Sequence, residues 1–112
     1  MATTELDARV RDDTASGGLA VIELNGDIDG RAEAALDEAY TTVEHSDDVR
    51  LDFSGVSYMN STGIALIVGL LARARKNGHT LSAAGLSPHY REIFEITRLA
   101  DFMTIVDEEE TA

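Results

Sequence analysis

The 112-residue sequence contains no cysteine, no tryptophan and a single proline, and aromatic residues make up only 5% of it. Without cysteine there are no disulfide bonds, no thiolate nucleophiles and no cysteine-ligated zinc or iron–sulfur sites. The longest apolar run, residues 64–72, is far shorter than the ~20 residues of a membrane-spanning helix. The first 13 residues lack the basic start and apolar core of a signal peptide. We therefore expect a cytoplasmic protein with no membrane insertion.

The composition is that of a folded domain with an acidic surface. Hydrophobic residues make up 44% and charged residues 27% of the chain, and the formal net charge is −12. A chain of this length forms one compact domain with one core. Nucleic acids and anionic membranes would be repelled by such a charge, so neither is an expected partner.

Hydrophobic periodicity predicts alternating strands and helices. Residues 6–11 alternate as a half-buried strand, and residues 19–25 are rich in strand-forming residues and end at Gly26, so we expect an N-terminal hairpin. Residues 31–45 have helical spacing. The order predicts an α/β fold with a mixed, mostly parallel β-sheet and helices packed on it. Further along the chain we expect strands at 49–56, 80–85 and 103–106, and helices at 61–76 and 87–102.

Two residues of the expected helices bear on helix stability, one at a helix start and one inside a helix. Ser87, followed by Pro88, is placed to cap the last helix. Gly69, inside the 61–76 helix, costs about 1 kcal/mol relative to alanine. We expect a close approach of that helix to the sheet to explain why this glycine is tolerated.

Motifs for catalysis are missing from the sequence. It has neither the G-x-G-x-x-G nor the G-x-x-x-x-G-K-[ST] phosphate loop, and no G-x-S-x-G elbow of serine hydrolases. His45, His79 and His89 lie in different segments without metal-ligand spacing, so surface or loop-capping roles are expected. No pair of carboxylates is marked as general acid and base. We expect no enzymatic activity, no metal and no cofactor.

A polar segment, Asn60-Ser61-Thr62-Gly63, directly precedes the most apolar run of the chain. At a strand-to-helix junction, Asn60 or Ser61 has an ordinary role as the helix N-cap. The same geometry favours an anion, because unpaired backbone N–H groups and the positive end of the helix dipole meet there. A phosphate on Ser61 would place negative charge at these donors.

These segments together resemble the STAS domain, and in particular the single-domain anti-sigma factor antagonists of bacteria. The matching features are "LDFSGV", the D-S-[ST]-G-like motif at residues 60–63, "ARARKNGH" and "GLSPHYREIFEITRLADF". The earlier "LNGDIDGRAEAAL" resembles the family's strand, loop and first helix, with Asp29 at the usual acidic position. The resemblance implies a single STAS domain over residues 1–112, with a core of about 4–107 and an acidic tail at 107–112.

The resemblance also implies a function. In this family the first serine of the motif, here Ser61, is phosphorylated by a kinase that is itself an anti-sigma factor. The unphosphorylated antagonist binds the kinase and frees a sigma factor, the phosphorylated form lets go, and a PP2C-type phosphatase resets the switch. Asp29, Asn60, Thr62 and Gly63 would surround the acceptor, although Asp29 also suits the N-cap of the first helix.

Asn60 is a departure from the family, which usually has aspartate before the serine. The amide removes a negative charge beside the acceptor and also removes a carboxylate that could orient the hydroxyl or contact the kinase. A second hypothesis is therefore a constitutive subunit with an unmodified serine, in a lipid-transport ATPase complex or a stress-sensing assembly. Copurification with an ATPase subunit would favour it. A small enzyme or nucleotide binder is the third alternative, which calorimetry against nucleotides would test.

Overall fold

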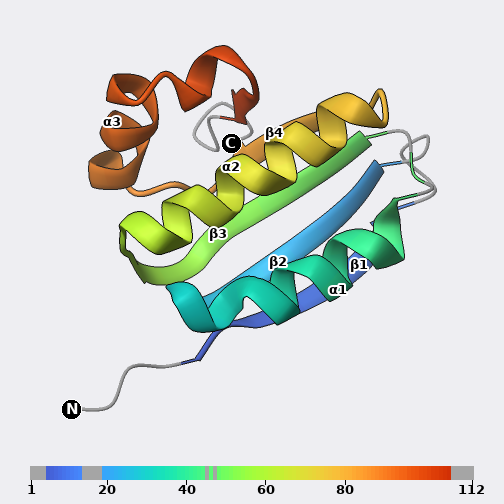
Figure 1. The fold of residues 1–112 in the computed structure, drawn as a ribbon, viewed down its shortest axis with the longest axis horizontal. Helices are drawn as coiled ribbons and strands as arrows, with labels where there is room; N and C mark the ends of the chain where they lie inside the picture. The colour runs from blue at the N-terminus through green and yellow to red at the C-terminus, as the bar shows by residue number, and fades with distance from the viewer. Residues whose placement is uncertain (1–4, 14–18, 45, 47, 107–112) are drawn as a thin grey trace.

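The strands form one sheet whose order equals the order along the chain (Figure 1). The structure, a computed structural model, describes residues 5–13, 19–44, 46 and 48–106. β1 pairs antiparallel with β2, and every later pair is parallel, which confirms the predicted mixed sheet and its N-terminal hairpin. The strands are β1 (Asp7–Asp13), β2 (Leu19–Ile28), β3 (Asp48–Met59), β4 (Thr80–Ala84) and β5 (Thr104–Val106).

Two of the helices, α1 (Glu33–Val43) and α2 (Ser61–Lys76), run side by side across the sheet (Figure 1). The third, α3 (Pro88–Ile96), follows β4, and its Phe94 packs edge-on against Phe53 of β3 with ring centroids 5.8 Å apart. Within the described part of the chain, no helix is both long and apolar enough to cross a membrane.

The core lies between the sheet and the helices because the strands alternate. In β3, Val49, Leu51 and Phe53 are buried, whereas Arg50 and Asp52 between them are half-buried. Period-2 alternation of this kind covers one face of a sheet and leaves the other face more polar. The helices contribute the opposing side chains, which include Leu36, Tyr40, Val43, Ile67, Leu70, Leu71, Ala74 and Phe94.

Two strands extend further than the sequence predicted. β2 was expected to end at residue 25, and β3 at residue 56, but the two pair as far as Ile28 and Met59. The extension passes an irregularity in register between Gly26 and Asp27, where Gly26 has a φ of 114° that glycine alone adopts readily. The sequence around Gly26 had predicted the end of β2, but the structure has a bulge there and the strand continues.

The first helix, α1, begins differently from the prediction, and the third helix, α3, ends differently. The segment expected as a helix over 31–45 starts with a 3-10 turn, η2 (Gly30–Ala32), before α1. The helix expected over 87–102 stops at Ile96, because Arg98 adopts a left-handed conformation with φ 69° and a second 3-10 turn, η3 (Leu99–Asp101), follows. Ser87 caps α3 as predicted, accepting a hydrogen bond from the Tyr90 N–H at 3.3 Å. The turn expected from "DDTASGG" at residues 12–18 does not begin at residue 12, because β1 continues to Asp13. Residues 14–18, His45 and the acidic tail at 107–112 lie outside the described residues.

The explanation expected for Gly69 is wrong. A Cβ at Gly69 would meet no atom within 4 Å, so this glycine is exposed and not pressed against the sheet. The close approach occurs one and a half turns earlier, at Gly63, where a Cβ would overlap the carbonyl oxygen of Ile28. The buried glycine of α2 is therefore Gly63, within the polar motif at residues 60–63.

Alanine substitutions at these two glycines should have opposite effects on stability. We expect Gly63→Ala to lower the free energy of unfolding by about 1–3 kcal/mol, because the new methyl group has no room. Gly69→Ala should raise it by up to about 1 kcal/mol, because alanine has the higher helix propensity. Urea denaturation of the two variants beside the native protein measures both changes, and a stabilising Gly63→Ala would contradict the close packing.

Candidate functional site

A single residue, Asn60, separates the end of β3 from the start of α2. Its side-chain oxygen Oδ1 accepts a hydrogen bond from the Gly63 N–H at 2.8 Å, and its carbonyl accepts one from the Ile64 N–H at 2.9 Å. Asn60 is thus the N-cap of α2, a role that the sequence left open between Asn60 and Ser61. Because Asn60 supplies the capping oxygen, the Ser61 hydroxyl is not needed as the cap.

Ser61 is the first residue of α2 and is exposed to solvent. Its hydroxyl forms no hydrogen bond with any residue that the structure describes. The backbone N–H groups of Ser61 and Thr62 belong to the first turn, which has no intrahelical acceptors for them. An exposed hydroxyl therefore lies beside backbone donors at the positive end of a helix dipole.

The first turn of α2 is held against the end of β2. The Asn60 N–H donates to the Ile28 carbonyl at 3.3 Å, and Gly63 packs against the same carbonyl group. A side chain at Gly63 would push the helix away from the strand. This contact fixes the position of Ser61 relative to the sheet.

Asp29 lies at this junction because it directly follows Ile28. Its carboxylate accepts a hydrogen bond from the Arg31 N–H at 3.0 Å and forms an ion pair with the Arg31 guanidinium at 2.9 Å. These hydrogen bonds to Arg31 lower the pKa of Asp29. Asp29 caps the η2 turn, which resembles the alternative role expected from the sequence, and a Cβ at Gly30 would lie 3.6 Å from Thr62 Cγ2.

The structure thus brings the segments of all the predicted site residues to one place. Asn60, Thr62 and Gly63 adjoin the segment 28–30 that holds Asp29, and Ser61 projects from the same turn. The roles of Asp29 and Thr62 toward a phosphorylated Ser61 stay predictions. The capping role of Asn60 is compatible with an aspartate at that position, since a carboxylate oxygen accepts the same hydrogen bond.

Two tyrosines that the sequence reasoning missed lie at the end of β3, next to the motif. The Tyr90 hydroxyl accepts a hydrogen bond from the Met59 N–H at 2.8 Å and so ties α3 to the end of β3. Tyr58, next to Met59, exposes 48% of its surface. The signal available in the sequence was a tyrosine three residues before Ser61, because aromatic residues are enriched at protein interfaces.

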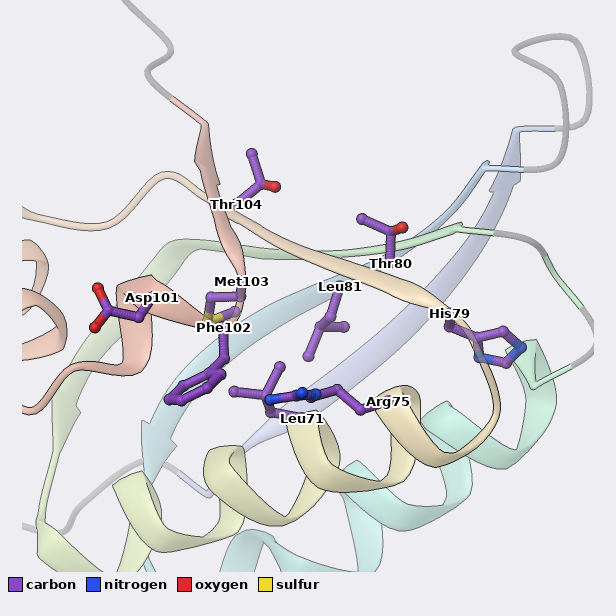
Figure 2. A pocket seen from close by; sticks show the side chains of 9 residues that line it. All are labelled: Leu71, Arg75, His79, Thr80, Leu81, Asp101, Phe102, Met103 and Thr104. Carbon is purple, nitrogen blue, oxygen red and sulfur yellow. The ribbon is translucent and has the colours of Figure 1, made fainter.

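A hollow of about 320 Å³ lies along the C-terminal half of α2, between this helix and β5 (Figure 2). Arg75 lies over the ring of Phe102 at 5.0 Å, and Asp101 pairs with Arg98 at 2.7 Å. His79, at the same hollow, is hydrogen-bonded to the Tyr40 hydroxyl at 2.7 Å. Among the described residues, no three histidine or acidic side chains are grouped so that they could hold a metal ion.

Comparisons with known proteins agree on one family. The family described as "Mlab, STAS domain" matches residues 12–107. The anti-sigma-B factor antagonist of Staphylococcus epidermidis is 33% identical over 86 residues, which cover 75% of this chain and 80% of that protein.

Solved structures show the same fold at lower identity. An anti-sigma factor antagonist from Mycobacterium paratuberculosis aligns with a TM-score of 0.74 at 20% identity, covering 90% of this chain and 85% of that one. The unphosphorylated form of the anti-sigma factor antagonist SpoIIAA aligns with a TM-score of 0.69 at 21% identity, covering 93% of each chain. A phosphorylated form of SpoIIAA from Bacillus aligns with a TM-score of 0.65 at 22% identity, covering 92% of this chain and 96% of that one.

Substitutions of Asn60 test the geometry of this junction. Asn60→Ala removes the cap, and we expect the free energy of unfolding to fall by about 1 kcal/mol. Asn60→Asp keeps the acceptor and adds a negative charge at the positive helix end, so at pH 7 it should be at least as stable as the native protein.

The stability of Asn60→Asp should also depend on pH. The helix dipole lowers the folded pKa of the new carboxyl below its unfolded value of ~3.9. The added stability is then present above that value and is lost as the pH falls through the folded pKa. Urea denaturation at pH 7 and pH 3 measures the difference, and an Asn60→Ala variant as stable as the native protein would refute the cap.

Proposed function

Because this chain belongs to the STAS domain family, we propose that it is an anti-sigma factor antagonist. In this function it is a non-catalytic binding protein that docks a kinase-type anti-sigma factor and thereby releases a sigma factor. The proposal is supported by the relative from Staphylococcus epidermidis, which is named an anti-sigma-B factor antagonist, and by the shared fold of the solved antagonists.

The observation that carries the proposal is the exposed, unbonded hydroxyl of Ser61 at the start of α2. A kinase can reach this oxygen without unfolding the domain. Transfer of the γ-phosphoryl group of ATP to Ser61 Oγ would add a charge of about −1.5 to −2. The helix N-terminus accommodates this charge within the domain, so its effect falls on a partner docked over the same surface.

Release follows from electrostatics. A partner that fits the neutral hydroxyl must, after phosphorylation, desolvate a dianion or face its own acidic groups, and either weakens the complex. A PP2C-type phosphatase would restore the binding form by hydrolysing the phosphoester with water. Asp29, Asn60, Thr62 and Gly63 act in this proposal as the surroundings that hold the acceptor in place.

One observation favours a second candidate. Asn60 replaces the aspartate usual in the family, and the amide satisfies the helix cap without any role in phosphorylation. A constitutive subunit of a lipid-transport ATPase complex or a stress-sensing assembly needs the fold and not the modification. Copurification with an ATPase subunit, and not with a kinase, distinguishes this candidate.

Incubation with ATP and each kinase-type anti-sigma factor of the source genome tests the switch. We expect one phosphate on the chain, located at Ser61 by mass spectrometry of peptides. Thr62→Ala is the matched control, because Thr62 carries the neighbouring exposed hydroxyl, and it should still be labelled. Labelling at Thr62 alone, or no labelling by any of these kinases, would contradict the assignment.

The Ser61 variants should separate binding from modification. Ser61→Ala should keep the affinity of the native protein for the kinase, whereas Ser61→Asp should bind about tenfold or more weakly because it carries the repulsive charge. Isothermal titration calorimetry at two salt concentrations measures both affinities. Equal binding by the two variants would remove the electrostatic mechanism.

A further inference from the structure

A groove of about 210 Å³ runs between α1 and α2 on the outer side of the helix pair. Its walls are apolar and include Leu36 of α1, which is buried, and Leu66 and Leu70 of α2. Apolar hollows of this kind on a surface favour the insertion of an apolar group from another molecule.

Gly69 keeps this groove open. It lines the groove, it is exposed, and no atom lies within 4 Å of the position that a Cβ would occupy. Glycine is unfavourable inside a helix, and here no close packing within the described chain requires it. The absence of a side chain at Gly69 therefore leaves the backbone of α2 open to the close approach of another molecule.

The rim of the groove is acidic. Glu33 is exposed at the rim and takes part in none of the ion pairs formed among the described residues. The other acidic group, Asp37, forms an ion pair with Arg73 at 2.6 Å, and Arg73 shares its single positive charge with Glu44 at 3.1 Å. Among the described residues, Glu33 thus remains without an ion-pair partner beside the apolar walls, and its negative charge is complementary to a cation on a partner.

The groove is continuous with the surface around Ser61. Ser61, Ala65 and Gly69 are four residues apart, so they form one row along the outer side of α2. Eight residues of helix correspond to about 12 Å between Ser61 and Gly69. A protein that covers the Ser61 hydroxyl and lies along α2 therefore reaches the groove.

We propose that the groove between α1 and α2 receives an apolar side chain of the anti-sigma factor, next to a lysine or arginine that pairs with Glu33. This inference rests on the proposed function. It adds that the anti-sigma factor must carry an apolar side chain next to a lysine or arginine. The groove supplies affinity, whereas Ser61, about 12 Å away, controls whether the same partner can lie along the helix.

Charge reversal at the rim tests the ionic part. Glu33→Lys should weaken binding of the kinase-type anti-sigma factor about tenfold or more, because like charges then meet at the groove. Glu38→Lys is the matched control: it changes the net charge equally, but Glu38 faces the hollow on the other side of α1, toward β1. We expect near-native affinity for this control. Equal losses for the two variants would attribute the effect to net charge and overturn the proposed pairing.

Filling the groove tests the apolar part. Gly69→Gln should reduce the affinity about tenfold or more while the variant stays folded by circular dichroism, whereas Ala34→Gln, at an exposed position of α1 that does not line the groove, should bind normally. If native protein binds the anti-sigma factor and Ser61→Asp releases it, but Gly69→Gln binds as well as native, the groove inference fails and the proposed function stands.

Two further outcomes would also overturn the inference. If no kinase-type anti-sigma factor of the source genome binds the native protein, the proposed function and the groove inference fail together. If sedimentation analysis finds a native dimer that Gly69→Gln dissociates, the groove is instead a contact between two copies of this chain.

Discussion

The contact between the first turn of α2 and the end of β2 is the constraint on which the site depends. Gly63 has no side chain because the carbonyl of Ile28 occupies that space, and the Asn60 N–H donates to the same carbonyl at 3.3 Å. Extended pairing of β2 and β3 brings the two segments to the same level of the sheet. Ser61 is consequently presented by the junction of two rigid elements and not by a loop, which limits its freedom before any partner arrives.

α2 combines two roles on opposite sides. Its inner side, with Ile67, Leu70 and Leu71, is buried and holds the helix on the sheet. Its outer side carries the small residues Ala65, Gly69 and Ala72 and the exposed Val68. In the proposed function, the helix that builds the core would also offer the surface on which the partner docks.

The sequence predicted the order of the elements, the mixed sheet and the cap at Ser87, because these depend on periodicity and on local hydrogen bonding. It failed where conformation depends on contacts between distant segments. Gly26 resembled a turn but lies in a bulged strand, and Arg98 ends α3 by a left-handed conformation that arginine rarely adopts. The close packing expected at Gly69 is absent, because spacing alone does not reveal which side of a helix meets a strand carbonyl.

The strand order also bears on how the protein is made. Every strand after the first pairs with the strand that precedes it in the chain, so no strand waits for a later segment to fill a gap in the sheet. Loop closure between consecutive elements is entropically cheaper than closure between the ends of a chain. The sheet can therefore grow in the direction of translation, each βα unit docking as it leaves the ribosome, with the short β5 closing the edge last.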